Sequence, residues 1–329
     1  MTARKLTEKV RKLAKSKGAE LVGFASMDRF GESPRMMHPE SHLPEARTVI
    51  SVAIHYGNAA VERAGKEPAE TLDPMWCSDH VLNARLMEAA YDVASYLESE
   101  GFPSLPFLPT QNWRVRPYKE IRTTHTSCLS HRHAAVAAGL GEFGLSGNVL
   151  TPEYGPRQRF NSIITTAALE PTPLYDGKPL CDNCMLCFKG CHEKCLGAMT
   201  REKIEISIGS KKCVYFKIDK WRCSWAEQFR LCGNAGAKHY GMSPDMPVPE
   251  KVSDKYPEEA ERIVREAMKD WDSVQRYVGV ATIGNCLQDC KPPCLRKKTP
   301  AKSSPDTNRA KGSRRPIART KKGETLKHA

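Results

Sequence analysis

The hydrophobic positions at the start of the chain follow helical spacing. Leu6, Val10 and Leu13 recur every three or four residues, with charged residues between them. Gly18 follows this stripe and is a candidate left-handed C-cap. The pattern therefore predicts an amphipathic helix within residues 1–20.

Later apolar runs predict a mixture of strands and helices. Residues 21–25 and 48–54 (TVISVAI) are apolar or β-branched and short, which favours buried strands. The next segment places an apolar residue on one face at each turn, begins at the candidate N-cap Ser78 and ends at Gly101. We also expect a helix over 134–138, a strand over 162–167 and a charged amphipathic helix over 257–277.

Composition places these elements in a globular chain rather than in a membrane. The 329 residues are 40% hydrophobic and 27% charged, and no apolar run reaches 18 residues. The N-terminus has neither an apolar export region nor a twin-arginine pair, so we expect a cytoplasmic protein without a membrane partner. In that compartment thirteen cysteines indicate metal ligands rather than disulfides, although Cys77 and Cys128 stand alone and are expected to be small buried apolar residues.

The positive charge is concentrated at the C-terminus. From Arg296 onward there are twelve Lys or Arg and two acidic residues, so this tail carries +10 of the net charge of +13. The tail has almost no large apolar residues to bury, so we expect it to be disordered. The tail is expected either to be a solvated segment or to contact RNA phosphates.

The spacing of four cysteines is the most specific motif. Cys181, Cys184, Cys187 and Cys191 form C-x2-C-x2-C-x3-C, in which three thiolates bind one [4Fe–4S] cube and the fourth binds a second cube. Zinc also binds four thiolates, but its sites usually combine two separated C-x2-C pairs. The spacing therefore favours iron–sulfur clusters.

A second group of cysteines supplies further ligands. Cys286, Cys290 and Cys294 bring the number of thiols to seven, whereas two cubes need eight. Reciprocal binding assigns Cys294 to the first cube and Cys191 to the second. The candidates for the eighth ligand are Cys195, Cys213, Cys223 and Cys232.

Residues 139–144 match the dinucleotide pattern G-x-G-x-x-G, but their context does not. A helix is expected before these glycines and a turn-rich segment after them, whereas the dinucleotide motif joins a strand to a helix. The glycines therefore indicate close backbone approach to a ligand or to a packed element, rather than NAD binding.

The chain resembles the corrinoid iron–sulfur reductases, a family that contains reductive dehalogenases and the tRNA-modifying epoxyqueuosine reductases. The match is clearest over residues 134–187, from AAVAAGLGEFGLSGNVL to CDNCMLC. Residues 20–25 and 44–56 resemble the family's opening stretches, and 218–223 (IDKWRC) resembles its Asp-x3-Cys motif. The resemblance covers roughly residues 5–295.

This resemblance implies an α+β fold with three parts. A nitroreductase-like corrinoid-binding module is expected over residues 1–175 and a ferredoxin-like module with two [4Fe–4S] clusters over 176–296. The basic tail, residues 297–329, follows.

The resemblance also implies the site residues. Cys223, four residues after Asp219, becomes the eighth ligand, although the family's second group reads C-x2-C-x3-C-Pro and this chain has C-x3-C-x3-C-Leu. The implied ligands are Cys181, Cys184, Cys187, Cys191, Cys223, Cys286, Cys290 and Cys294. The residues implied to line the cobalamin are Gly139, Leu140, Gly141, Glu142, Gly144, Gly147, Thr151, Tyr154, Gly155 and Arg159.

His125 is the implied proton donor. It occupies the position at which epoxyqueuosine reductases have an aspartate proposed for this role, and imidazole can deliver a proton near neutral pH. The alternative is that His125 is a structural polar residue between Thr124 and Thr126.

Three functions are compatible with these residues. The leading interpretation is a reductive dehalogenase-like enzyme that takes electrons from a ferredoxin or flavodoxin and cleaves a carbon–halogen or carbon–oxygen bond of a small molecule. The first alternative is an epoxyqueuosine reductase-like enzyme acting on tRNA, and the second is a non-catalytic electron-transfer or corrinoid-binding protein. Glu142 favours the leading interpretation, because it is typical of the dehalogenase form of the glycine turn.

Overall fold

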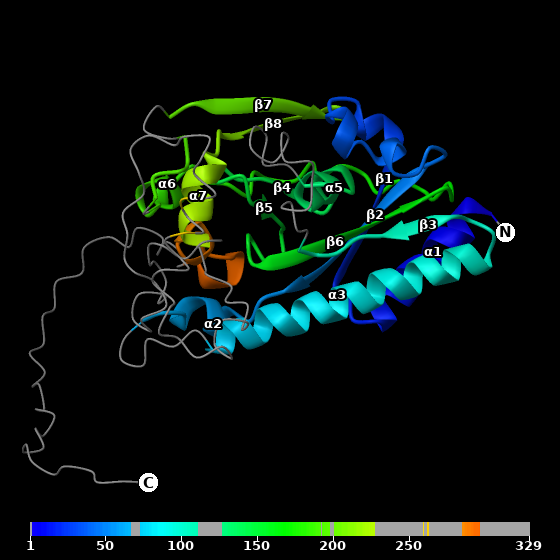
Figure 1. Cartoon of the computed structure of the whole chain (residues 1–329), viewed down its shortest axis with the longest axis horizontal. Helices are drawn as coiled ribbons and strands as arrows, with labels where there is room; N and C mark the ends of the chain where they lie inside the picture. Colours follow the sequence, from blue (N-terminus) through cyan, green and yellow to red (C-terminus); the bar gives the residue numbers. More distant parts are fainter. Residues whose placement is uncertain are drawn as a thin grey trace, which may run out of the picture. The chain divides into compact units, whose positions relative to one another are not determined.

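A four-stranded antiparallel sheet lies at the centre of the computed structural model (Figure 1). Its strand order is β1-β2-β6-β3, built from β1 (Leu21–Ser26), β2 (Thr48–His55), β6 (Gln158–Thr165) and β3 (Ser104–Pro106). In β2, successive side chains face opposite sides of the sheet, and both sides are buried, which explains its unbroken apolar sequence. The strands predicted over 21–25 and 48–54 are thus confirmed.

The structure describes most of the chain up to residue 227 and a short segment near the C-terminus. The described residues are 2–66, 73–110, 127–191, 193–197, 201–227, 259, 262 and 285–296. Residues 1–296 form one compact unit, and residues 297–329 lie outside the described part. The predicted tail and almost all of the predicted helix over 257–277 therefore cannot be compared with it, and the expected boundary after residue 175 stays a prediction.

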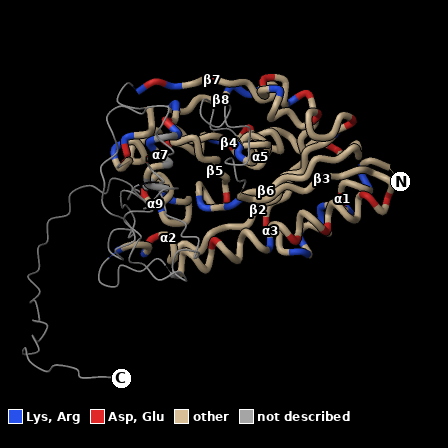
Figure 2. Tube along the Cα trace, viewed as in Figure 1, with Lys and Arg blue, Asp and Glu red and all other residues tan. Residues whose placement is uncertain are grey.

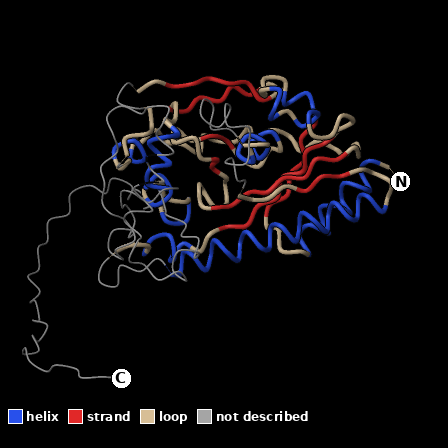
Figure 3. Tube along the Cα trace, viewed as in Figure 1, coloured by secondary structure: helices blue, strands red, loops and turns tan. Residues whose placement is uncertain are grey.

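Two helices cover one face of the sheet. They are α1 (Ala3–Ser16) and α3 (Asp73–Ser99), and their apolar stripes pack with β1, β2 and β6 in one hydrophobic cluster (Figure 3). Helix α1 has Thr2 as its N-cap and is followed by Gly18 at φ +96°, as the apolar pattern predicts. Within the described residues, no helix combines the length and the apolar composition that crossing a membrane requires.

The start of α3 differs from the prediction. The helix begins at Asp73, and the Ser78 hydroxyl donates to the Pro74 carbonyl oxygen over 2.7 Å instead of capping the helix. Met75 is only 2% exposed and extends the apolar stripe by nearly two turns toward the N-terminus. Burial of Met75 thus outweighs the local capping preference of Ser78.

The other face of the sheet is covered by α5 (His131–Ala137) and a hairpin. The hairpin consists of β7 (Lys203–Ile208) and β8 (Lys211–Phe216), and its apolar residues join those of α5 in a second cluster. Between α5 and β6 lies a small two-stranded sheet of β4 (Glu142–Phe143) and β5 (Val149–Leu150). The chain is therefore a mixed helix and sheet fold with both sheet faces buried.

Short helices carry the cysteine-rich part. They are α6 (Leu186–Lys189), α7 (Lys220–Glu227), α9 (Asn285–Gln288) and the 3-10 helix η5 (Pro293–Leu295). Helix α9 contacts both α6 and α2 (Asn58–Arg63). Basic and acidic residues are interspersed along α3 and the β7–β8 hairpin (Figure 2), whereas α1 carries six Lys or Arg and one Glu.

A buried arginine attaches the last described segment to the body. The Arg157 guanidinium is 1% exposed, pairs with the Glu62 carboxylate and donates to the Gln288 carbonyl oxygen over 3.2 Å. The Gln288 amide donates in turn to the carbonyl oxygens of Val61 and Ala64. These bonds place residues 285–296, with their three cysteines, against α2.

Candidate functional site

The first cysteine group lies in a tightly turned segment around α6. Asn183 and Met185 have φ of +56° and +62°, and Lys194 just after the group has φ of +51°. Such values are uncommon for residues with a side chain and persist where the surroundings require them, often at functional sites. The turns bring Cys181 and Cys187 onto one apolar cluster with Phe188.

Cys290 lies near the first three cysteines of this group. Helix α6, which carries Cys187, contacts α9, which ends just before Cys290. Burial, together with the charges of Cys187, Cys181 and Cys184, raises the pKa of Cys290 to about 12. The Arg296 guanidinium, which acts in the opposite direction, donates to the Leu180 carbonyl oxygen over 2.8 Å. Two cysteine groups about 100 residues apart in the sequence thus meet in the fold.

A second set of thiols surrounds Cys191. Its Sγ lies 3.3 Å from the Sγ of Cys195, and Cys223 and Cys286 contact the same apolar cluster. Hydrogen bonding by the Cys195 thiol lowers the pKa of Cys191 to about 6, because it stabilises the thiolate form. The charge and hydrogen bonding of Cys191 and Cys223 raise the pKa of Cys195.

The other cysteines lie apart from both sets. Cys213 on β8 is buried in the cluster shared with α5, and Cys294 is exposed. Cys128 is half-buried, whereas Cys77 is exposed on α3, so the expectation of a buried apolar role is wrong for Cys77. Cys232 lies outside the described residues.

The donor set consists of thiols in two neighbouring groups. Among the described residues, no three His, Cys, Asp or Glu side chains converge as the ligands of one metal ion do. The four thiolates of a cube bind four different iron atoms and lie farther apart than those of a single tetrahedral ion. Soft thiolates in apolar surroundings, spread over two neighbouring groups, fit two iron–sulfur clusters.

The glycine turn packs against the protein's own backbone. A Cβ on Gly139 would lie 2.1 Å from the Pro173 carbonyl oxygen, and one on Gly141 would lie 2.0 Å from that of Leu150. The turn follows α5 and leads into β4, so the order is helix, turn, strand. A dinucleotide motif would instead join a strand to a helix, so its rejection from the sequence agrees with the structure. Of the two explanations for these glycines, close packing of elements accounts for Gly139 and Gly141.

The remaining glycines of the implied corrinoid site also face protein atoms. A Cβ on Gly144 would meet the Leu150 side chain, and one on Gly147 would meet that of Ile218. A Cβ on Gly155 would lie 2.8 Å from the Cα of Pro292. Gly155 therefore lies directly against the segment that carries Cys290 and Cys294.

Glu142 links the glycine turn to the first cysteine group. Its carboxylate accepts from the Leu180 backbone N–H over 2.7 Å and from the Lys211 ammonium over 3.1 Å. Leu180 immediately precedes Cys181. The contacts of Glu142 that the structure shows are thus structural.

A partly exposed polar network surrounds Arg159. Its guanidinium donates to Asp79 over 2.8 Å, to Asn83 over 3.0 Å and to the Thr110 hydroxyl over 3.0 Å. The Tyr56 hydroxyl donates to the same Asp79 carboxylate. Thr110 is the last described residue before the gap at 111–126. His125 falls in this gap and therefore lies outside the described residues.

Thr151 and Tyr154 are fixed by neighbouring side chains. The Thr151 hydroxyl accepts from the Tyr154 backbone N–H and donates to Gln158. The Tyr154 ring stacks on His55 at a centroid distance of 4.6 Å, and the Glu20 carboxylate accepts from the His55 ring. Beside them, Gly139 and Leu140 line a cavity of 220 Å³. The structure thus brings part of the implied corrinoid set together.

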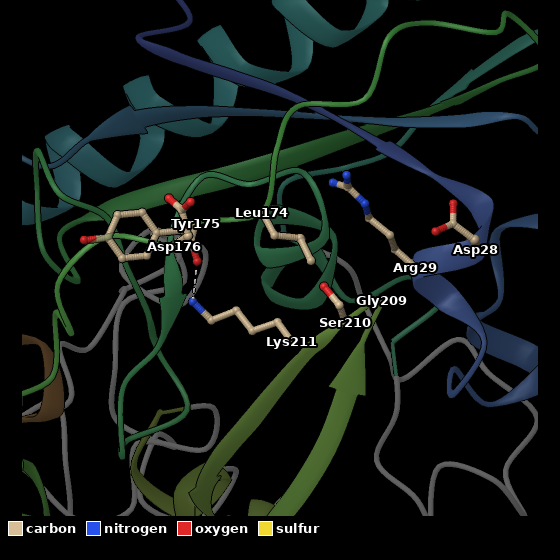
Figure 4. Close-up of a pocket in the computed structure, with 8 residues that line it drawn as sticks. All are labelled: Asp28, Arg29, Leu174, Tyr175, Asp176, Gly209, Ser210 and Lys211. Atoms are coloured by element: carbon tan, nitrogen blue, oxygen red, sulfur yellow. Dashed lines mark hydrogen bonds between the residues drawn. The ribbon is translucent and has the colours of Figure 1, made fainter.

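A larger cavity that the sequence did not indicate lies near the tip of the β7–β8 hairpin (Figure 4). It measures 790 Å³ and is lined by Asp28, Arg29, Leu174, Tyr175, Asp176, Gly209, Ser210 and Lys211. Arg29 donates to the carbonyl oxygens of Ala137 and Thr172, and Lys211 donates to that of Tyr175. The hydrogen bonds of Arg29 and Lys211 thus connect neighbouring segments of the fold.

Comparison with curated proteins gives two kinds of relative. An epoxyqueuosine reductase of Bacillus cereus is 25% identical over 242 residues, 66% of this chain and 57% of that protein, and one of Staphylococcus aureus is 25% identical over 59% of this chain and 46% of that protein. A tetrachloroethene reductive dehalogenase of Sulfurospirillum multivorans is 33% identical over 105 residues, 30% of this chain and 21% of that protein. The chain spans about half the length of the epoxyqueuosine reductases that it matches.

A solved reductive dehalogenase structure shares the fold. A reductive dehalogenase studied for B12-dependent dehalogenation has a TM-score of 0.50 at 16% identity, over 84% of this chain and 36% of that chain. An epoxyqueuosine reductase bound to a tRNA stem loop has a TM-score of 0.48 at 16% identity, over 88% of this chain and 72% of that chain. No protein-family model matches the chain. The curated matches confirm the resemblance that the motifs indicate: the chain is a relative of the epoxyqueuosine reductases and the reductive dehalogenases.

Proposed function

We propose that the chain is a corrinoid- and [4Fe–4S]-dependent reductase that acts on an epoxyqueuosine-type base in tRNA. The observation that carries this proposal is the meeting of thiols from distant segments, because Cys290 lies near Cys181, Cys184 and Cys187. Four thiols from two distant segments provide the soft donor set that an iron–sulfur cluster requires, and bound iron would compensate the charge of the thiolates that ligate it. Two bound clusters would supply single-electron transfer.

The iron–sulfur part of the proposal uses the apolar surroundings of the thiols. The rings of Phe188 and Phe216 contact each other at a centroid distance of 5.0 Å, tilted by 39°, beside the cysteine cluster. An apolar shell limits water access and tunes the reduction potential of a bound cluster. A low-potential ferredoxin or flavodoxin is the proposed electron donor, as the sequence analysis expects.

The corrinoid part uses the segment from Gly139 to Arg159. Two described contacts link it to the cysteines: Glu142 accepts from the Leu180 N–H beside Cys181, and Gly155 lies against Pro292. A corrinoid bound along this segment would therefore lie near the clusters. When bound, the corrinoid would supply reductive cleavage of a carbon–oxygen or carbon–halogen bond, and the protein would supply position and electrostatics. His125 stays the proposed proton donor, and the Arg159 network holds Thr110 at the start of its segment.

The choice of substrate follows the curated relatives. Most of them are epoxyqueuosine reductases, which supports the tRNA-directed alternative over the leading interpretation from the sequence. The basic tail agrees with an RNA substrate, because Lys and Arg bind phosphates. Dehalogenation is the second candidate, supported by the 33% identity over 105 residues with the tetrachloroethene reductive dehalogenase.

The test is a set of reconstitution assays under anaerobic conditions. Full-length protein is loaded with iron, sulfide and cobalamin, passed through gel filtration and supplied with a low-potential electron donor. We expect retained cobalamin and conversion of epoxyqueuosine in tRNA, with no reduction of tetrachloroethene. Cys184→Ser should abolish turnover, whereas Cys213→Ser, a change at a buried thiol outside both sets, should preserve it.

Other outcomes of these assays would change the proposal. Reduction of the organohalide without conversion of tRNA would favour the dehalogenase candidate. Retained cobalamin and iron with neither turnover would favour the non-catalytic alternative. Iron-loaded protein that does not retain cobalamin would contradict the corrinoid part.

A further inference from the structure

Cys195 lies inside the thiol cluster although the sequence motif does not include it. It is 5% exposed, and its Sγ is 3.3 Å from that of Cys191. Its backbone N–H also donates to the Cys191 Sγ over 3.3 Å, and Cys223 is its second thiol neighbour. Cys195 therefore lies between two of the expected ligands of the second cube.

The surroundings of Cys195 suit a cluster ligand. Leu145, Leu196 and Phe216 form the buried apolar core of this region, and Cys286 packs against it from α9. An apolar site with several thiols favours a metal cluster, because the clustered thiolates gain compensation of their charge only from bound iron.

Cys294 lacks these surroundings. It is exposed, and the contact shown for its Sγ is with the Asn58 amide of α2 at 3.6 Å. Cys290, in contrast, is half-buried and close to the first cysteine group. Exposure does not separate the two by itself, because Cys184 is exposed as well. The nearness of Cys290 to the first cysteine group assigns the C-terminal ligand of the first cube to Cys290 rather than Cys294.

This assignment explains the irregular spacing of the second cysteine group. If Cys286 and Cys290 are the last two positions of C-x2-C-x3-C, the first position falls on Ile283, which has no thiol. The second cube then lacks one ligand, and Cys195 is the buried thiol next to Cys191 and Cys223.

We propose that Cys195 replaces this missing ligand and that Cys294 binds no cluster. The inference rests on the proposed function, because it requires two clusters. The resulting sets are Cys181, Cys184, Cys187 and Cys290 for the first cube and Cys191, Cys195, Cys223 and Cys286 for the second. Rotation about χ1 moves each Sγ between staggered positions, so Cys191 and Cys195 can separate to bind different irons.

The test measures iron and acid-labile sulfide in full-length protein reconstituted anaerobically, together with the EPR spectrum after reduction. Wild-type protein should contain about eight iron atoms and about eight sulfides per chain. Cys195→Ala should reduce both to about four and remove one of the two cluster signals. Cys294→Ala and the control Cys213→Ala should keep about eight of each.

Two results would overturn this ligand assignment. One is Cys195→Ala protein with about eight irons, and the other is Cys294→Ala protein with about four. The remaining cluster signal of Cys195→Ala serves as the check that the protein has folded. If Cys195→Ala shows no cluster signal at all, Cys195→Val is the second variant, because it fills the buried site without offering a donor atom, and a fully loaded Cys195→Val protein would contradict the assignment. Wild-type protein that binds no iron would instead contradict the proposed function.

Discussion

Two half-buried histidines show how tertiary contacts set the pKa of single residues. The His131 ring contacts the Ser162 hydroxyl with Nδ1 and the Leu108 carbonyl oxygen with Nε2. Because a carbonyl only accepts, Nε2 carries the proton and Nδ1 accepts from the serine in the neutral ring. Burial lowers the pKa of His131 to about 4, and it lowers the pKa of His133 to about 4 as well.

These histidines predict a loss of stability in acid. Their pKa in the folded protein lies below the usual value of 6.5, so the unfolded chain binds more protons between pH 6.5 and pH 4. The free energy of unfolding should therefore fall as the pH is lowered through this range. Urea unfolding at several pH values measures it, and His131→Gln should flatten part of the dependence. An unchanged pH dependence in the variant would contradict this origin.

The glycine turn illustrates packing between elements. It joins α5 to β4, and its backbone lies against β5 and against residues 172–173. The sequence pattern indicated close approach without indicating the neighbour. The fold supplies these neighbours: the Pro173 carbonyl oxygen lies against Gly139, and the Leu150 carbonyl oxygen lies against Gly141.

We predict that Gly141→Ala destabilises the fold. The added Cβ would lie 2.0 Å from the Leu150 carbonyl oxygen, and overpacking of this kind costs about 1–3 kcal/mol of unfolding free energy. Gly31→Ala is the matched control, because its Cβ would have no neighbour within 4 Å, and it should change stability by less than about 0.5 kcal/mol. Chemical denaturation compares the two. Wild-type stability of Gly141→Ala with loss of cobalamin binding would show that this glycine faces the ligand instead.

The elements that were predicted correctly have strong local patterns. Residues 21–26 and 48–55 form strands because their apolar runs are buried on both faces. The strand predicted over 162–167 begins earlier, at Gln158, because Gln158 and Arg159 find polar partners within the fold. The β7–β8 hairpin was not predicted, since its alternating lysines and apolar residues are typical of an exposed segment as well.

At the scale of the whole molecule, charge separates the body from the tail. Residues 1–295 carry about a quarter of the net charge of +13, and the tail carries the rest. Ion pairs of the body, such as Lys217 with Glu202, connect neighbouring elements, and the six basic residues of α1 are offset by acidic residues elsewhere in the body. Attraction to RNA is therefore expected to depend on residues 296–329.

We predict that removal of residues 297–329 weakens tRNA binding and its salt dependence together. Each lost phosphate contact should reduce the slope of log K against log salt by about 0.7 to 0.9. Binding measured across a salt series tests this, with a control tail of equal length in which Lys and Arg are replaced by Gln. Equal slopes for full-length and truncated protein would contradict a role of the tail in RNA binding.

The candidate site was only partly predictable from spacing. The run of cysteines at 181–191 identified a cluster motif, and Asp219 identified Cys223 through the family resemblance. The neighbours of Cys195 and Cys290 were not predictable, because each depends on segments that lie far apart in the sequence. Exposure of Cys294 was likewise invisible in a motif that treats all three cysteines alike.

The sequence by itself determined the number of thiols, the periodicity of α1 and the apolar runs of β1 and β2, because these are local properties of the chain. Only the tertiary structure decided which thiols share one apolar cluster. The reason is that contacts between distant parts of the chain hold residues 285–296 in place. The buried Arg157 binds Glu62 and the Gln288 carbonyl oxygen, contacts that span 95 and 131 residues of sequence.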